Sequence, residues 1–170
     1  MIIRKLFKFE GAHIVRNCTS VRCRENIHGH SYIVEVFLTS DKLDNGYMVT
    51  DFARLAKIKQ VIDAFDHSYI LWDQEDAEFK DFVYKYNKRI VEIPVSPSAE
   101  GFALLFLKIS DSIINKMERV NGEGNVKISS VRVHETATGY AEAFIDDLKM
   151  ADFEISDVHY SDAILEEWRD

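Results

Sequence analysis

Cysteine and proline are both scarce in this chain, with two of each among 170 residues. Two thiols cannot form the disulfide framework that stabilises many small secreted domains, so Cys18 and Cys23 are expected to be free. The two prolines, Pro94 and Pro97, lie close together, and the sequence contains no proline-rich linker. A single domain with an ordinary core is expected, because 46% of the residues are hydrophobic.

Long apolar runs and net positive charge are also missing from the sequence. No stretch reaches the roughly 18 consecutive apolar residues of a membrane-spanning helix. The N-terminal sequence MIIRKLFKFEGAH is interrupted by charges and does not have the apolar core of a secretory signal. We therefore expect a cytoplasmic protein with no membrane partner. The formal net charge of −8 argues against a nucleic-acid partner as well.

The acidic residues are concentrated near the C-terminus. Residues 145–170 contain nine acidic and two basic residues, and this segment therefore carries −7 of the net charge of −8. We divide the chain into a nearly neutral domain, residues 1–145, and an acidic C-terminal extension, residues 146–170. The extension is expected to be a solvated helix or an extended appendage.

The hydrophobic pattern predicts an α+β fold. Strands are expected at residues 2–14, 28–40, 89–93, 125–135 and 139–146, and helices at residues 53–65 and 98–118. Residues 15–27 read as a polar loop, and residues 73–88 as a loop or short helix. Ser98 is expected to cap the second helix. Two strands, two helices and two further strands predict an antiparallel sheet covered by helices.

Three histidines are candidates for a metal site. His28 and His30 are separated by one residue in a predicted strand, so both imidazoles project from the same face. His13 ends the preceding strand, and antiparallel pairing would place it beside the start of the second strand. Three imidazoles can bind zinc and leave a fourth position for a substrate oxygen. The alternative is a chance alternation of histidines on a half-buried strand.

Cys23 is a candidate general base in the loop before the metal strand. Its neighbours Arg22 and Arg24 would favour a thiolate, which can remove a proton from carbon. Cys23 could instead be a fourth zinc ligand or an ordinary loop thiol, and Cys18 could hold the role. Arg16, together with Arg22 and Arg24, could bind a triphosphate.

Three further positions carry acid–base or recognition chemistry. Asp66 can orient His67 as a proton shuttle, although a histidine at a helix end is often only structural. Glu135, at the end of a strand, can accept two parallel N–H bonds from an aminopyrimidinone ring. Glu100 is either a second acidic contact for that ring or an ordinary first-turn acid of the long helix.

Taken together, these motifs resemble the 6-pyruvoyltetrahydropterin synthase and 6-carboxytetrahydropterin synthase family over residues 1–145. The motifs, in order, are F-E-G-A-H ending at His13, Cys23 before H-G-H, Asp51-Phe52, Asp66-His67, Ser98-Ala99-Glu100 and H-E-T at 134–136. The resemblance implies a tunnelling (T-fold) ββααββ subunit, whose sheets join into a barrel in a trimer or hexamer, with the active site between subunits. It implies zinc ligands at His13, His28 and His30 and a catalytic base at Cys23. The same resemblance implies a relay at Asp66 and His67, with the pterin bound by Glu135 and near Glu100.

The resemblance also implies the substrate, 7,8-dihydroneopterin triphosphate. H-G-H-S-Y and E-T-A-T are more similar to the branch that makes 6-carboxytetrahydropterin, acetaldehyde and triphosphate for queuosine and 7-deazapurines. The alternatives are the 6-pyruvoyl synthase of the tetrahydrobiopterin route and a non-catalytic zinc- or pterin-binding module. A structural protein with incidental histidines is a further alternative.

Overall fold

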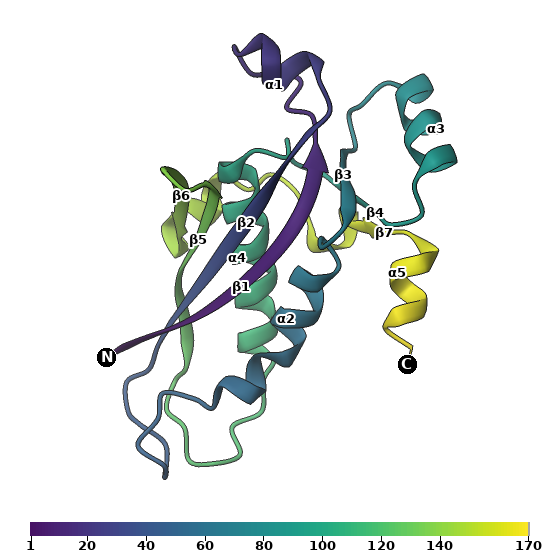
Figure 1. Cartoon of the computed structure of the whole chain (residues 1–170). Coiled ribbons are helices and arrows are strands. Elements are labelled where there is room, and N and C mark those ends of the chain that lie inside the picture. Colours follow the sequence, from purple (N-terminus) through teal and green to yellow (C-terminus); the bar gives the residue numbers. More distant parts are fainter. Residues whose placement is uncertain (170) are drawn as a thin grey trace.

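A computed structural model describes residues 1–169 as one mixed sheet with helices packed against it (Figure 1). The strands are β1 Ile2–His13, β2 His28–Thr39, β3 Ser68–Trp72, β4 Ile90–Ile93, β5 Lys127–Thr136, β6 Gly139–Phe144 and β7 His159–Tyr160. The helices are α1 Val21–Glu25, α2 Ala56–Asp63, α3 Ala77–Tyr86, α4 Ala99–Asn115 and α5 Asp162–Glu167, with 3-10 turns η1 Phe52–Leu55, η2 Ile145–Met150 and η3 Ile155–Asp157. The predicted α+β fold is confirmed.

The sheet has the strand order β6-β5-β2-β1-β3-β4-β7. The central strands β1, β2, β5 and β6 are antiparallel neighbours, as predicted. β3 runs parallel to both β1 and β4, so the sheet is mixed rather than purely antiparallel. The sequence analysis missed β3 because its five residues lie between a turn and a charged segment. It also missed α1, which lies inside the segment expected to be a loop.

An aromatic core joins the sheet to helices α2 and α4. Phe9 on β1 stacks on Tyr32 of β2, with ring centroids 4.6 Å apart, and contacts Phe102 and Phe106 of α4 edge-on. All four side chains are at most 1% exposed. Burial of each such side chain stabilises the fold by about 1.5–3 kcal/mol. The Ser98 side chain accepts a hydrogen bond from the Gly101 N–H at 3.1 Å and caps α4, as predicted.

The other face of the central strands carries a ladder of charges. Glu35 on β2 pairs with Arg4 on β1 and lies 3.5 Å from Arg132 on β5, which in turn pairs with Glu142 on β6. Glu35 also accepts a hydrogen bond from His134 at 2.8 Å. Glu35 is only 4% exposed because these long side chains cover it. This face therefore has neutralised charges rather than an apolar layer.

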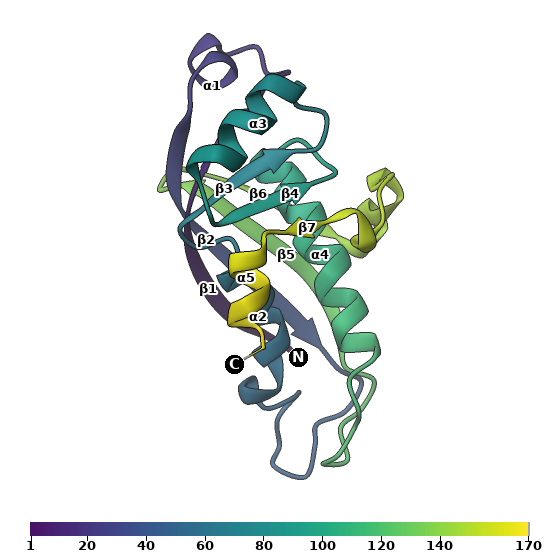
Figure 2. The ribbon, with the colours of Figure 1, turned by 90° about the vertical axis from the view of Figure 1, so that its right-hand side faces the viewer.

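The C-terminal extension is packed on the rest of the chain and is not a free appendage. From β6 it passes α4 through η2 and η3, and β7 then pairs with β4 at the opposite edge of the sheet (Figure 2). Phe153, Val158 and Ile164 are buried in the main core. We call residues 146–169 the strap, because they cross α4 from one sheet edge to the other.

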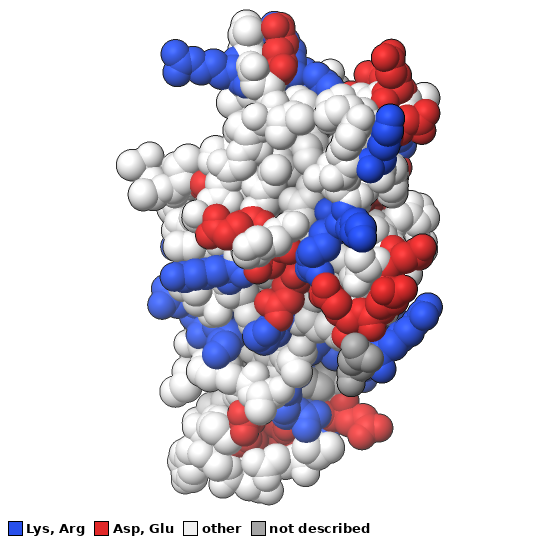
Figure 3. All heavy atoms as spheres, turned by 45° about the vertical axis from the view of Figure 1, so that its right-hand side comes forward, with Lys and Arg blue, Asp and Glu red and all other residues white. Residues whose placement is uncertain are grey.

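The acidic residues of the strap do not create a surface of one sign. On the face that includes α5, acidic and basic side chains lie side by side (Figure 3). Glu167 pairs with Arg89, and Lys108 lies 3.5 Å from Glu154. None of the described helices combines the length and the apolar character needed to cross a bilayer.

One edge of β1 is largely open. β3 pairs with β1 only at Gly11 and Ala12. Within residues 1–169, the remaining length of β1 pairs on one side only, with β2, and β6 pairs only with β5. The antiparallel part of the sheet thus has hydrogen-bonding groups available on both of its flanks.

Candidate metal centre

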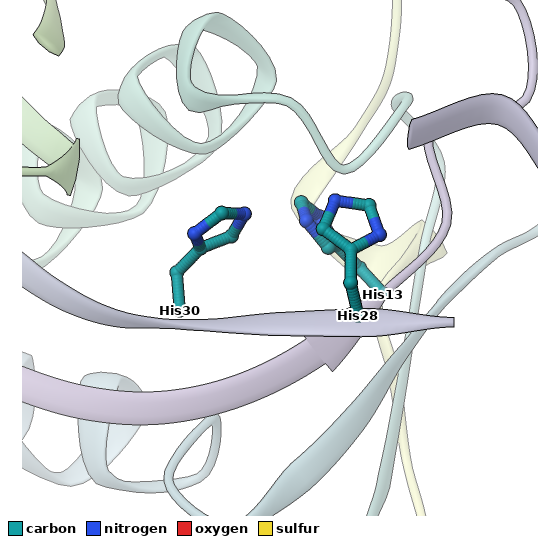
Figure 4. Close-up of side chains that lie close together, drawn as sticks. All are labelled: His13, His28 and His30. Atoms are coloured by element: carbon teal, nitrogen blue, oxygen red, sulfur yellow. The ribbon is translucent and has the colours of Figure 1, made fainter. Parts of the chain in front are cut away.

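Three imidazoles meet on the helix-covered face of β1 and β2. The antiparallel register sets His13 opposite His28, and Gly11 opposite His30. Residues two apart on a strand share a face, so all three rings point to the same side of the sheet (Figure 4). One ligand atom from each lies within 4.8 Å of the others. The structure therefore brings together the three histidines that the sequence singled out.

Backbone carbonyls orient two of these rings. The Nδ1 atom of His13 lies 2.6 Å from the Pro97 carbonyl oxygen, and that of His28 lies 2.9 Å from the Asn26 carbonyl oxygen. A ring that donates from Nδ1 to a carbonyl carries its free lone pair on Nε2. Both rings are thereby prepared to bind a metal through Nε2.

The charge state of His13 also suits a ligand. Burial, together with the neighbouring His28 and His30, lowers the pKa of His13 to about 4, against the opposing effect of the Pro97 hydrogen bond. A metal-binding imidazole must be neutral, and His13 is neutral throughout the physiological range. Three imidazoles, two of them oriented by backbone carbonyls, are a donor set that zinc accepts.

Close packing of the two strands depends on Gly29. A Cβ atom at this position would lie 2.8 Å from the Gly11 carbonyl oxygen on β1, closer than backbone atoms allow. The absent side chain lets β1 and β2 approach where they carry His13, His28 and His30. The glycine between the two histidines is thus part of the geometry of the site.

Glu135 reaches the same site from β5. Its Oε1 atom lies 3.9 Å from Nε2 of His13 and 3.8 Å from Nε2 of His30. The side chain is 32% exposed, so one end of the carboxylate remains accessible to a ligand. A carboxylate here can bind a ring held beside a metal ion.

Two contacts of the site were not predicted. The Tyr32 hydroxyl lies 3.3 Å from ring nitrogens of His13. Its alternation with His28 and His30 on β2 could have revealed this side chain. The Pro97 carbonyl, by contrast, gives no side-chain signal, since only the path of the chain before α4 brings it to His13.

Asp66 and His67 form a pair on the turn between α2 and β3. His67 Nδ1 lies 2.9 Å from Asp66 Oδ2, and Asp66 Oδ1 accepts the Glu10 N–H at 2.7 Å. Burial would raise the pKa of Asp66, but the Glu10 and His67 hydrogen bonds and the charges of His67 and Arg89 hold it below its usual value. Asp66 is therefore ionised at neutral pH and orients the imidazole of His67.

This pair lies across the sheet from the metal centre. His67 lines an open pocket of about 400 Å³. Most of the β1 and β2 residues in its lining belong to the opposite set of alternating positions from the three histidines (Glu10, Ala12, Gly29 and Ser31), and Gly11 and His30 border it as well. The His67 side chain is 76% exposed. The sequence paired Asp66 with His67 but did not indicate that β1 and β2 separate them from the metal ligands of the same chain.

Cys23 lies on α1, in the segment between β1 and the metal strand. Both cysteines are free, and Cys23 is half-buried. Its backbone carbonyl accepts the Val15 N–H at 3.0 Å, which attaches α1 to the end of β1. Among the described residues, its thiol makes no hydrogen bond with the histidines or with Asp66 and His67. Cys18 donates to the Ser20 carbonyl.

The remaining predicted residues surround the site less closely. Glu100 is exposed in the first turn of α4, just after Pro97 and Ser98. Arg16 is bound to Glu75 at 2.8 Å and packs over Phe79. Arg24 pairs with Glu25, whereas Arg22 makes no ion pair within residues 1–169.

Comparisons with known proteins agree on one family. A family described as 6-pyruvoyl tetrahydropterin synthase matches residues 2–145. A 6-carboxy-5,6,7,8-tetrahydropterin synthase of Helicobacter pylori is 45% identical, over 100% of this chain and 88% of its own length. A protein of the same name from Aquifex aeolicus is 35% identical, over 82% of this chain and 95% of its own length.

Solved structures share the fold. An uncharacterised protein of Wolinella succinogenes matches with a TM-score of 0.67 and 24% identity, over 85% of this chain and 98% of its own. A 6-pyruvoyl tetrahydropterin synthase of Plasmodium vivax matches with a TM-score of 0.57 and 22% identity, over 84% and 97%. The expected tunnelling fold is confirmed by these neighbours.

Proposed function

The chain belongs to the 6-pyruvoyl tetrahydropterin synthase family, and we propose that it is a zinc-dependent 6-carboxy-5,6,7,8-tetrahydropterin synthase. The proposed substrates are 7,8-dihydroneopterin triphosphate and water, and the products are 6-carboxytetrahydropterin, acetaldehyde and triphosphate. The observation that carries the proposal is the 45% identity, along the whole chain, to a relative of that name. The proposed product is an intermediate of queuosine and 7-deazapurine biosynthesis.

The metal centre supports the zinc part of the proposal. His13, His28 and His30 would hold the ion through Nε2 and leave a position for substrate. A bound zinc ion would act as a Lewis acid toward the side-chain oxygens of the pterin. Glu135, within 4 Å of two ligand nitrogens, would bind the amino-pyrimidinone edge and fix the reacting carbons near the histidines.

Proton transfer is proposed for Cys23 and for the Asp66–His67 pair. Cys23, on the segment joining the two metal strands, would take a proton from a substrate carbon as thiolate. His67, oriented by Asp66, would return a proton at another position. Triphosphate would leave, and cleavage in the manner of a retro-aldol reaction, with water as the second reactant, would release acetaldehyde. Glu100 would make a lesser contact with the ring, and Arg16, Arg22 and Arg24 would make lesser contacts with the phosphates.

The separation of His67 from the metal centre supports a site shared between copies. His67 is on the opposite face of the sheet from the metal ligands of its own chain, and its side chain is largely exposed. The open edges of β1 and β6 are suited to pair with other copies and close a barrel. We therefore include in the proposal a trimer, which can double to a hexamer, in which His67 of one copy serves the metal of another.

The test of function is product analysis of zinc-loaded protein incubated with 7,8-dihydroneopterin triphosphate. Acetaldehyde together with a 6-carboxypterin is the expected result. A 6-pyruvoyl product would leave the proposed site residues unchanged but would replace the proposed reaction with that of a 6-pyruvoyl synthase. That alternative reaction is the one for which the matching family is named. Bound zinc and pterin without any product would leave only a binding module.

The shared site has a separate test in mixed assemblies. His67→Ala and His30→Ala copies, each inactive alone, are co-expressed and purified together. A shared site pairs an intact metal centre from one copy with an intact His67 from the other, so turnover should return in part. If each site lies within one chain, the mixture should be as inactive as its components.

A further inference from the structure

Arg89 holds the backbone of the turn that carries Asp66 and His67. It lies directly before β4, and its guanidinium donates to the Asp66 carbonyl from Nε at 3.0 Å. Its Nη2 atom donates to the carbonyls of Asp63 at 3.1 Å and Ala64 at 3.5 Å. One side chain thus binds three carbonyls at the C-terminal end of α2, where the helix dipole favours a cation.

This turn needs external support because its backbone is strained. His67 has a φ of 54°, in the left-handed region that a non-glycine residue adopts only at an energetic cost. The His67 N–H donates to the Glu10 carbonyl at 2.7 Å, and the Glu10 N–H donates back to Asp66. β1 therefore fixes one side of the turn, and Arg89 fixes the other.

The remaining guanidinium nitrogen of Arg89 contacts the C-terminal strap. Its Nη1 atom donates to Glu167 on α5. The strap is attached to the same place a second time, because Ser161 and Ile90 exchange hydrogen bonds at 3.0 and 3.1 Å. α5 itself is anchored by Ile164, which is completely buried. The strap lies outside residues 2–145, the region matched by the family. Through Glu167 it thus contacts Arg89, which holds the turn that carries His67.

We propose that Arg89, itself oriented by Glu167 of the strap, is a positioning residue that sets the direction and charge environment of the Asp66–His67 pair. The inference rests on the proposed function of that pair in proton transfer. Arg89 touches neither substrate nor metal and acts only through the turn. Its positive charge is also one of the influences that hold the pKa of Asp66 low.

The two contacts of Arg89 differ in strength. Its bonds to carbonyls come from a side chain that is only 23% exposed, whereas Glu167 is 58% exposed. An exposed ion pair contributes little, so the carbonyl bonds should dominate. A planar guanidinium can reach three carbonyls at once, and the single ammonium of lysine cannot.

The test compares four variants of the full-length, zinc-loaded protein. Arg89→Met removes the bonds and the charge, Arg89→Lys keeps the charge, and Glu167→Gln removes the ion pair. Glu166→Gln is the matched control, because it changes an exposed acid one residue away that has no ion pair among the described residues. Turnover is measured against pH, and amide hydrogen exchange is followed at Glu10 and His67.

For Arg89→Met, kcat should fall by about tenfold or more while KM changes by less than about twofold. The acidic limb of the kcat profile should move to higher pH, since the Asp66 carboxylate loses a neighbouring cation. In Arg89→Lys, the acidic limb of the kcat profile should lie at the same pH as in the wild type, but kcat should remain below the wild-type value. Glu167→Gln should lower kcat by about two- to threefold, and Glu166→Gln should match the wild type.

Exchange at the Glu10 and His67 amides should accelerate in the order Glu167→Gln, Arg89→Lys, Arg89→Met. Unchanged kcat, pH limb and exchange in Arg89→Met would overturn the proposal. If Arg89→Met does not fold, the kcat and amide exchange of Arg89→Lys, compared with those of Glu166→Gln, test the proposal in its place. Equal behaviour of Glu167→Gln and Glu166→Gln would remove the strap from the proposal. A wild type without product would refute the proposed function, and the exchange data would still decide the positioning.

Discussion

At the scale of single residues, the charged and polar groups of this chain are separated by the two faces of one sheet. Strand alternation puts His13, His28 and His30 on the helix-covered face and Glu35 on the other. The first group forms a candidate metal centre, and the second is part of a neutralised ladder. Residues close together along β2 thus belong to two different groups, one that can bind a metal and one that forms ion pairs.

Glu35→Gln should lower the free energy of unfolding by about 1–3 kcal/mol at pH 7, because Arg4, Arg132 and His134 lose a charged partner. Burial alone would raise the pKa of Glu35, but the His134 hydrogen bond and the Arg4 charge outweigh burial and lower it. The contribution is therefore complete above the ordinary carboxyl pKa and lost as pH falls through the lowered one.

Urea unfolding of both proteins between pH 7 and pH 3 checks this dependence. The two stabilities should converge as the pH falls, since protonated Glu35 is as neutral as glutamine. The exposed Glu118→Gln is the control and should follow the wild type. A constant difference across the pH range would contradict the role of the ionised carboxylate.

The sequence indicated which side chains share a face of a strand, but it did not indicate which groups from other elements lie opposite that face. Strand parity and the antiparallel order were enough to predict the histidine cluster, because both are local rules. Whether His67 faces the metal depends on the path of the turn after α2, and this path is set by contacts with β1 and Arg89. No periodicity in the sequence encodes those contacts.

At the scale of elements, most of the long regular segments were predictable and most of the short ones were not. The exceptions are the four-residue β4, which was expected at residues 89–93, and the ten-residue α3, which lies in a segment expected to be a loop or short helix. β1, β2, β5, β6 and α4 have ten or more residues or a clear alternation, and they occur close to their predicted bounds. β3, α1 and β7 have five residues or fewer, and their existence depends on partners distant in sequence. Short elements are selected by tertiary contacts rather than by propensity.

Gly29→Ala should weaken zinc binding by about 10–100-fold, the range for changes that disturb the support of metal ligands. The new Cβ would push β2 away from the Gly11 carbonyl and displace His28 and His30 together. Zinc content and competition with a chelator measure the effect. Gly139→Ala is the control, since a Cβ there meets only an ordinary contact with Thr136. Equal affinity in both variants would contradict the close-approach argument.

Ile164→Ala should destabilise the whole chain by about 2–5 kcal/mol, since the side chain is completely buried against the core. Trp168 follows α5 and Trp72 ends β3, so fluorescence reports on the strap and the sheet together. Fluorescence and circular dichroism should give one coincident transition. The exposed Glu166→Ala should have little effect. An early, separate loss of α5 alone would show that the strap unfolds independently.

At the scale of the whole molecule, the chain looks incomplete as a single copy. β1 and β6 each leave a flank of the antiparallel sheet unpaired within residues 1–169, and His67 is exposed on the wrong face for its own metal centre. Tyr140 and Phe144 of β6 are more than half exposed. The proposed association of copies would account for the open flanks and the exposed aromatics together.

Phe144→Glu should therefore yield a single chain of 19.7 kDa in sedimentation, whereas the wild type should sediment as a multiple of that mass. The variant should retain zinc, because His13, His28 and His30 belong to one copy, but it should lose turnover. Tyr47→Glu is the control, since Tyr47 lies in a turn and is 86% exposed. A wild type that is active as a single chain would refute the shared site.

The strap also imposes an order on biosynthesis. Residues 1–30, with all three metal ligands, are translated long before residues 146–169, which pass α4 and cover the free edge of β4. A nascent chain can therefore bring its three clustered histidines into place while the far edge of its sheet is still unprotected and Arg89 still lacks Glu167. If the proposed function holds, metal capture would precede the arrangement of the Asp66–His67 pair, and a segment synthesised late would complete the proposed machinery.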